Sequence, residues 1–196
     1  MNTLFPIFLK ADQLHFLIIG GGKVGLEKYN AIRNQSVKAK ISVVAFHFIP
    51  EFLTRLQSDK NASYTLDFAN EKHFTGVDIV ISALANKDCT AYMRSVAKNR
   101  GLLFNAADQP EFCDFYLGSI VRKGDLKFAI STNGKSPTMA KRWREILDEL
   151  VPDNSQQTLE NLEKIRSQLT SDFEEKIKVL NELTANFVVP KKIENT

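Results

Sequence analysis

Three glycines near the N-terminus have the spacing of a phosphate-binding turn. Gly20, Gly22 and Gly25 fit the pattern G-x-G-x-x-G, directly after the apolar run 14–19 and before an amphipathic segment at 24–33. In a strand–turn–helix of this kind, the first glycine permits a tight turn, the second admits a pyrophosphate, and the third lets the helix pack closely on the strand. The N–H groups at the helix start favour an anion. The pattern therefore predicts dinucleotide binding; the alternative is a glycine turn that binds nothing.

A second chemical candidate is an aspartate that follows a short apolar segment. Asp108 comes just after residues 102–106 (LLFNA), which places it at the carboxyl edge of the expected sheet, where open α/β sheets bind ligands. A carboxylate in this position is suited to act as a general base. The alternative is a purely local role, because Asp-Gln-Pro is also ordinary turn chemistry in which the aspartate bonds to its own backbone.

The elements that must position these residues alternate between strand and helix. This alternation predicts an α/β fold, a Rossmann-like parallel sheet built from βαβ units. The expected strands are 14–19, 40–45 (KISVVA), 63–66, 78–84 (DIVISAL) and 102–106, and the expected helices are 24–33, 50–55 and 88–100.

The pattern changes after Asp108. Strands at 115–121 and 126–131 follow each other without a helix, which predicts an antiparallel hairpin. A helix is expected from Pro137 to Leu150, and 156–187 shows helical spacing with one apolar side.

These elements divide the chain into an NAD-binding domain at 1–112, a hairpin segment at 113–135 and a helical subdomain at 136–196. Since a lone hairpin is only marginally stable, we expect the hairpin to be a dimerisation segment and the protein to be a homodimer.

Composition limits the classes of function. The chain has 196 residues, 43% of them hydrophobic and 25% charged, with a net charge of +3. This charge is too weak to predict nucleic-acid binding, and no apolar run approaches the roughly 18 residues of a membrane span. The two cysteines form no C-x-x-C pair and the three histidines lie far apart, so we expect no metal site and a cytoplasmic, reduced protein.

Four segments together carry a family resemblance: GGGKVG at 20–25, VVAFHFIPEF at 43–52, NAADQPEFCDFYLGSIV at 105–121 and ISTNGKSP at 130–137. The chain resembles the precorrin-2 dehydrogenase family, the module that opens multifunctional sirohaem synthases. The resemblance implies oxidation of precorrin-2 to sirohydrochlorin in sirohaem synthesis, with NAD as the hydride acceptor, and in some members insertion of ferrous iron. Because the chain has no room for a methyltransferase domain, it resembles a stand-alone member.

The resemblance also implies which residues meet the cofactor. Lys23 and Val24 would lie against the phosphates through their N–H groups, and Phe46 and His47 would line the adenosine end. The general fingerprint expects an acid about 20 residues after the glycines, and none stands at the end of the second strand. Since no basic residue stands at Phe46 or His47 either, we expect NAD rather than NADP. The alternative for His47 is a partly exposed loop residue.

The same resemblance assigns the chemistry to Asp108, which would take the proton released on dehydrogenation. Asn105 and Asp114 flank it and would orient Asp108 or contact substrate.

A polar turn supplies the other substrate candidates. Thr132, Lys135 and Ser136 lie in the turn 131–137, whose N–H groups and lysine suit the carboxylates of a tetrapyrrole. Plain N-capping by Ser136 is the alternative, and Asn133 is expected to adopt a positive φ.

Two rival functions stay open. A non-catalytic, NAD-responsive regulator would use the same fold and dimerise through its appended helices, but it would need no aspartate or basic turn at 105–137. A chelatase that hardly uses NAD is disfavoured by the intact glycine pattern. Two roles are open for Cys113: a soft ligand for iron, or a small buried hydrophobic residue.

Overall fold

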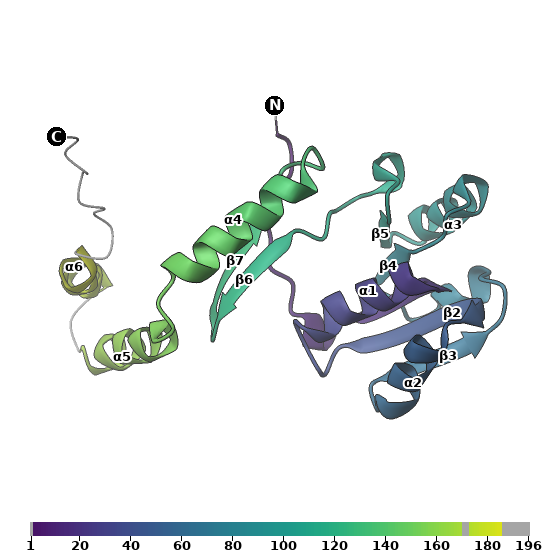
Figure 1. Ribbon diagram of the computed structural model, residues 1–196. Coiled ribbons are helices and arrows are strands. Elements are labelled where there is room, and N and C mark those ends of the chain that lie inside the picture. The colour runs from purple at the N-terminus through teal and green to yellow at the C-terminus, as the bar shows by residue number, and fades with distance from the viewer. Residues whose placement is uncertain (1, 170–172, 186–196) are drawn as a thin grey trace. The chain divides into compact units, whose positions relative to one another are not determined.

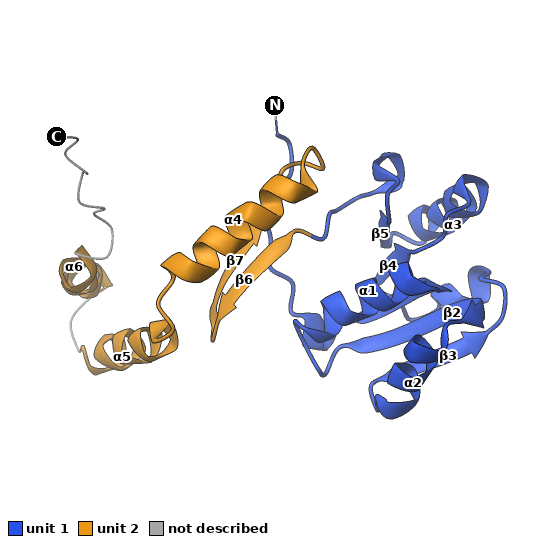
Figure 2. Cartoon of the chain, in the orientation of Figure 1, with its two compact units in different colours: residues 1–117 blue, residues 118–196 orange. Residues whose placement is uncertain are grey.

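The protein consists of two compact units, residues 1–117 and 118–196 (Figure 2). The structure is a computed structural model that describes residues 2–169 and 173–185 (Figure 1). The first unit is an α/β domain, and the second combines a hairpin with helices.

A five-stranded parallel sheet forms the centre of the first unit. Its strands run in the order β3-β2-β1-β4-β5. Their bounds are His15–Gly21 (β1), Lys40–Phe48 (β2), Ala62–Leu66 (β3), Ile79–Ser82 (β4) and Leu103–Ala106 (β5). Successive strands from β1 to β3 extend the sheet in one direction, and β4 and β5 extend it in the other. The carboxyl ends of β1 and β4 therefore form the switch point at which sheets of this kind bind ligands. The Rossmann-like fold expected from the sequence is confirmed.

Helices cover both faces of this sheet (Figure 1). On one face lie α1 (Lys23–Arg33) and α2 (Pro50–Ser58), and on the other lies α3 (Lys87–Asn99). Three short 3-10 helices, which the sequence pattern did not predict, occupy Ala11–Gln13, Glu71–Phe74 and Pro110–Phe112.

Two-sided burial explains why the strands are nearly continuous apolar runs. Ile18 points to the α1 side and is fully buried, whereas Leu17 points to the α3 side and is equally inaccessible. Each such side chain contributes roughly 1.5–3 kcal/mol relative to an exposed one. The first unit therefore has a core on each face of its sheet, which holds the strand ends in place.

The second unit contains β6 (Ser119–Lys123), β7 (Leu126–Ile130), α4 (Pro137–Leu150), α5 (Ser155–Gln168) and α6 (Phe173–Thr184). The two strands form the expected antiparallel hairpin, with Gly124 at a positive φ of 64° in its turn. The expectation that the first of them begins at Phe115 is wrong. The Asp114 amide donates to the Phe104 carbonyl, and the Asn105 side chain donates to the Phe115 carbonyl, so this stretch is held against β5 instead.

Helix α4 begins where the sequence predicted. The Ser136 hydroxyl accepts a hydrogen bond from the Met139 amide at 3.1 Å, and Pro137 is the first helical residue. The apolar stripe predicted at 156–187 falls on α5 and α6. Residues 170–172 and 186–187 of this range, and the C-terminal tail, lie outside the described residues. In the ranges that the structure describes, no helix is long and apolar enough to cross a membrane.

Candidate functional site

The glycine turn joins β1 to α1 in a conformation that two of its glycines make possible. Gly20 has φ +126°, and a Cβ there would lie 3.0 Å from the Ala83 carbonyl oxygen. A Cβ on Gly25 would lie 2.1 Å from the Gly20 carbonyl oxygen. These contacts agree with the expected roles of the first and third glycines, because a larger residue at Gly20 would collide with Ala83 beyond β4, and one at Gly25 would push α1 off the strand.

Gly21 has a structural role that the spacing argument missed. A Cβ at this position would lie only 2.2 Å from the carbonyl oxygen of His47, and the Ile49 amide donates to the Gly21 carbonyl at 2.9 Å. The turn is thus pressed against the end of β2, where the pairing register shifts after Ile19. The run of three consecutive glycines was the only local signal for this contact.

Gly22 differs from its neighbours because nothing lies within 4 Å of the position of an added Cβ. It is the exposed N-cap of α1, and no side chain caps the first turn of that helix. Lys23 and Val24 follow, both exposed. Open space beside N–H groups without a side-chain cap is what a pyrophosphate requires. The residues present therefore fit a dinucleotide, and the phosphate contacts expected of Lys23 and Val24 stay a prediction.

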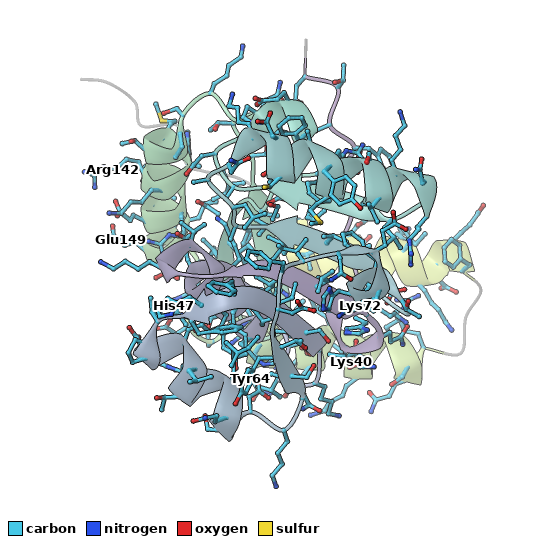
Figure 3. The ribbon with its side chains drawn as sticks, turned by 90° about the vertical axis from the view of Figure 1, so that its right-hand side faces the viewer. Lys40, His47, Tyr64, Lys72, Arg142 and Glu149 are labelled. Carbon is cyan, nitrogen blue, oxygen red and sulfur yellow. The ribbon has the colours of Figure 1, made fainter. Side chains whose placement is uncertain are left out.

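The end of β2 carries the residues expected at the adenosine end. Phe46 is 70% exposed and His47 is also exposed. Figure 3 labels His47 and Lys40 at opposite ends of β2, so Lys40 is remote from this edge. No carboxylate stands on the end of β2, as the sequence indicated.

An aromatic partner of Phe46 was not found from the sequence. Phe68, just beyond β3, is also 70% exposed and stacks on Phe46 with ring centroids 4.7 Å apart and planes inclined by 15°. Asp67 beside it pairs with Lys72 at 2.6 Å. Two large exposed aromatic rings at the carboxyl edge form an apolar platform that suits a planar base.

Asp108 lies on the same edge, two residues beyond β5. It is exposed and has φ +57°, in the left-handed region that aspartate tolerates better than most residues. Within the described part of the chain its carboxylate has no hydrogen-bond or ion-pair partner. An unpaired carboxylate held at a ligand-binding edge is available to accept a proton.

The two residues expected to flank Asp108 are engaged in internal contacts. The Asn105 amide is buried and donates to the Phe115 carbonyl at 2.8 Å. Asp114 accepts a hydrogen bond from the Phe104 amide at 2.9 Å and pairs with Arg94. These contacts support β5 and the loop after it, and the substrate contact of Asn105 stays a prediction.

The remaining substrate candidates lie together in one turn of the second unit. The Thr132 hydroxyl accepts from the Ser136 amide at 3.2 Å, and the Lys135 amide donates to the Thr132 carbonyl at 3.1 Å. Asn133 has φ +55°, as expected, and Lys135 is exposed. The structure thus groups the cofactor candidates and Asp108 on one sheet edge, and Thr132, Lys135 and Ser136 in one capped turn.

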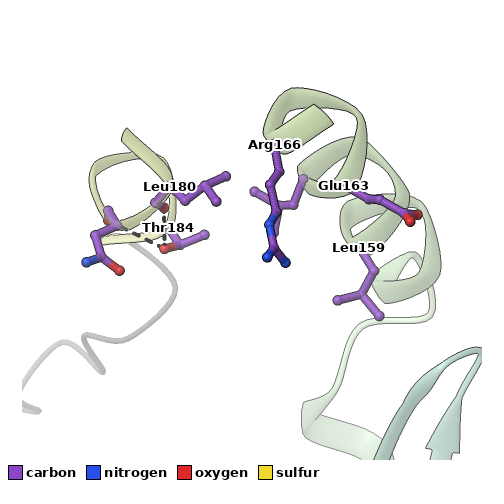
Figure 4. Close-up of a pocket in the computed structure, with 7 residues that line it drawn as sticks. Leu159, Glu163, Arg166, Leu180 and Thr184 are labelled. Carbon is purple, nitrogen blue, oxygen red and sulfur yellow. Dashed lines mark hydrogen bonds between the residues drawn. The ribbon is translucent and has the colours of Figure 1, made fainter. Parts of the chain in front are cut away.

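A separate hollow of about 400 Å³ lies between α5 and α6 (Figure 4). It is lined by Leu159, Leu162, Glu163, Arg166, Leu180, Asn181 and Thr184. None of the predicted site residues belongs to it. Among the described residues, no cluster of three or more His, Cys, Asp or Glu side chains could hold a metal ion.

Comparison with known proteins agrees with this geometry. Residues 7–119 match the family described as "Putative NAD(P)-binding". The chain belongs to this family. Residues 123–150 match a second family, described as "Sirohaem biosynthesis protein central". The first match includes the glycine turn and Asp108, and the second includes β7 and α4.

Curated relatives are longer than this member of the NAD(P)-binding family. A siroheme synthase from Psychrobacter cryohalolentis is 31% identical over 180 residues, covering 92% of this chain and 33% of that protein. A siroheme synthase from Pseudoalteromonas translucida is 31% identical over 149 residues, covering 76% of this chain and 31% of that protein. The chain therefore spans about a third of the length of the curated relatives it matches.

A solved structure shares the fold. The precorrin-2 dehydrogenase SirC superposes with a TM-score of 0.72 at 22% sequence identity, covering 92% of this chain and 89% of that one. This match shows the fold, and the siroheme synthase relatives together with the two family matches confirm the family resemblance of the sequence.

Proposed function

We propose that this protein oxidises precorrin-2 to sirohydrochlorin with NAD as the hydride acceptor. The observation that carries the proposal is the unpaired carboxylate of Asp108, two residues beyond β5, on the same sheet edge as the open N-cap at Gly22. The names of the matching siroheme synthases and of the fold neighbour SirC support the choice of substrate.

Dehydrogenation of a reduced tetrapyrrole removes a hydride and a proton from the substrate. NAD, when bound, supplies the hydride acceptor. The N–H groups of Lys23 and Val24 hold the phosphates, and the Phe46 ring supports the adenosine end. Asp108 accepts the proton through its free carboxylate oxygen. The turn of Thr132, Lys135 and Ser136 binds substrate carboxylates.

The charges around the adenosine end support NAD over NADP. Phe46 and His47 carry no fixed positive charge for a 2′-phosphate, and Lys40 stands at the other end of β2. Lys72 is paired with the Asp67 carboxylate. An added phosphate would therefore meet Asp67 as well as Lys72, and two anions so close repel each other.

We further propose that the protein works as a homodimer in the cytoplasm. On α4, four large apolar side chains follow the helical spacing of one face and are exposed: Met139, Trp143, Ile146 and Leu150. A second copy of this chain would cover such a stripe. Both cysteines are free, which suits a reducing compartment.

Substitution of Asp108 tests the reaction. Asp108→Ala is expected to retain its fold and NAD affinity and to lose about 10²–10⁴-fold in turnover, the usual contribution of a general base. Glu111→Gln is the matched control, because Glu111 lies in the same loop and its carboxylate forms an exposed ion pair with Lys87. An Asp108→Ala enzyme with a near wild-type rate would remove Asp108 from the mechanism. NAD binding without precorrin-2 turnover in the wild type would instead favour an NAD-responsive regulator.

A further inference from the structure

The loop that carries Asp108 is closed by the thiol of Cys113. The Cys113 sulfur accepts a hydrogen bond from the Ala106 amide at 3.2 Å and lies 3.3 Å from the Ala106 carbonyl oxygen and 3.5 Å from the Gln109 carbonyl oxygen. Ala106 precedes Asp108 and Gln109 follows it. One side chain therefore binds the backbone on both sides of the proposed base.

The protonation of this thiol matches its contacts. Burial raises the pKa of Cys113, and the nearby carboxylates of Asp114 and Glu111 act in the same direction. The group is therefore a neutral thiol, which both donates to a carbonyl and accepts from an N–H. A thiolate would be repelled by the carbonyl oxygens that Cys113 contacts.

Gln109 ties the same turn to the neighbouring strand. Its side chain is buried, and the amide nitrogen donates to the Leu84 carbonyl at 2.8 Å, just beyond β4. The Ala107 amide donates to the Ser82 carbonyl at 2.9 Å. These two bonds fix the turn to the end of β4, which is adjacent to β1 and its glycine turn.

The turn needs such ties because Asp108 is in an uncommon backbone conformation. Its φ of +57° is rarely adopted by residues other than glycine, so it persists only where the surroundings hold it. The carboxylate itself has no partner among the described residues. Its position is therefore set by the backbone, and the backbone is held by Cys113 and Gln109.

We propose that Cys113 and Gln109 are positioning residues, which hold the Asp108 carboxylate in place for proton transfer. This inference rests on the role proposed for Asp108. Neither residue is a catalytic residue, since each acts through the backbone of the turn. A misplacement of about 1 Å at a catalytic group is enough to lower a rate by as much as about 100-fold, so loosening the turn is expected to reduce turnover without affecting the glycine turn.

The experiment compares Cys113→Ala, Cys113→Ser and Gln109→Leu with Cys89→Ala in the full chain. Cys89 is the matched control, because it is the other free cysteine and is exposed on α3. Three quantities are measured for each variant: the steady-state kcat and KM with their pH dependence, the Kd for NAD, and the hydrogen exchange of the amides at 106–113.

We expect Cys113→Ala to lower kcat about tenfold, to shift the acidic limb of the pH profile, and to leave the Kd for NAD within about twofold. Exchange of the 106–113 amides should become faster. Cys113→Ser should recover most of the rate, because a hydroxyl also donates and accepts. Gln109→Leu should resemble Cys113→Ala, and Cys89→Ala should resemble the wild type.

Two results would overturn the proposal. Faster amide exchange in Cys113→Ala with an unchanged kcat and pH profile would show that Cys113 holds the turn but that proton transfer does not depend on it. Unchanged exchange in Cys113→Ala would show that the thiol does not hold the turn. A wild-type protein that binds NAD but does not turn over precorrin-2 would instead refute the proposed function. Hydrogen exchange of the 106–113 amides would still show whether Cys113 holds the turn.

Discussion

The two units of this protein bury their side chains to very different extents. In the first unit, helices cover both faces of the sheet and each face has its own core. Among the described residues of the second unit, Val121 and Ala140 alone are buried, and α4 exposes a stripe of large apolar side chains. The first unit therefore has its own two-sided core, whereas the second exposes the stripe that we propose is covered by a second copy of the chain.

The largest effect should come from filling the tight contact between α1 and β1. Gly25→Ala places a methyl group 2.1 Å from the Gly20 carbonyl oxygen, and backbone cannot move aside cheaply. We expect a loss of about 3 kcal/mol in the free energy of unfolding of the first unit, measured by urea denaturation.

Gly22→Ala is the matched control for this substitution. The added methyl group meets no atom within 4 Å, so stability should change by less than about 0.5 kcal/mol. Its affinity for NAD should nevertheless fall, because the methyl group fills space proposed for the pyrophosphate. Equal stability losses in the two variants would contradict this division between packing and binding.

The stripe on α4 can be tested by replacing its aromatic side chain. Trp143→Ser should weaken self-association by about 2 kcal/mol, as expected for a central aromatic residue in an interface. Light scattering over a dilution series measures this change. Arg142→Ser is the control, because Arg142 makes an exposed pair with Glu145 on the same helix. A wild-type monomer at micromolar concentration would refute the proposed dimer.

The aromatic platform should contribute a smaller amount to cofactor binding. We expect Phe68→Ala to weaken NAD and AMP about fivefold each, since stacking a base on an aromatic ring contributes about 1–3 kcal/mol. Titration calorimetry with both ligands measures this. Val37→Ala serves as the control, because Val37 is equally exposed but precedes β2 and so lies toward the opposite edge. Unchanged affinities would remove Phe68 from the site.

Acid should affect the first unit slightly through Asp59. Burial by itself would raise the pKa of this carboxyl, but hydrogen bonds from Tyr29, the Asn61 amide and Arg33 lower it below its ordinary 3.8. Folding thus favours the charged form. The stability that Asp59 contributes is present above about pH 4 and is lost as the pH falls through the lowered pKa of the folded state.

Tyrosine fluorescence can follow the unfolding of the first unit at each pH, because all four tyrosines lie in that unit. As the pH is lowered below about 4, the urea concentration at the unfolding midpoint should fall less steeply for Asp59→Asn than for the wild type. Parallel slopes would show that Asp59 contributes nothing.

Local patterns predicted the sheet well because burial on both faces produces apolar runs that end where the strand ends. Strands β2, β4 and β5 and helix α4 all begin within one residue of expectation. The prediction that a strand begins at Phe115 was wrong because hydrogen bonds of Asp114 and Asn105 hold this stretch against β5. Such side-chain contacts leave no periodic pattern in the sequence.

The site was predictable only in part, for the same reason. Gly22 and Gly25 follow from spacing, and Asp108 follows from its place after an apolar strand. Gly21 and Phe68 were missed because their contacts, with the His47 carbonyl and the Phe46 ring, exist only once neighbouring strands are paired. The hydrogen bonds of Cys113 and Gln109 that hold the Asp108 turn also form only once the loop 106–113 is folded.

The proposed dehydrogenation is tested by an anaerobic assay of the purified protein with enzymatically prepared precorrin-2, in the presence and absence of NAD. Sirohydrochlorin absorbance and NADH fluorescence are followed together. We expect both products to appear in equal amounts, only when NAD is present, and Asp108→Ala to lose most of this turnover. Sirohydrochlorin formation without NADH, or no turnover by protein that binds NAD in a titration, would contradict the proposed dehydrogenation.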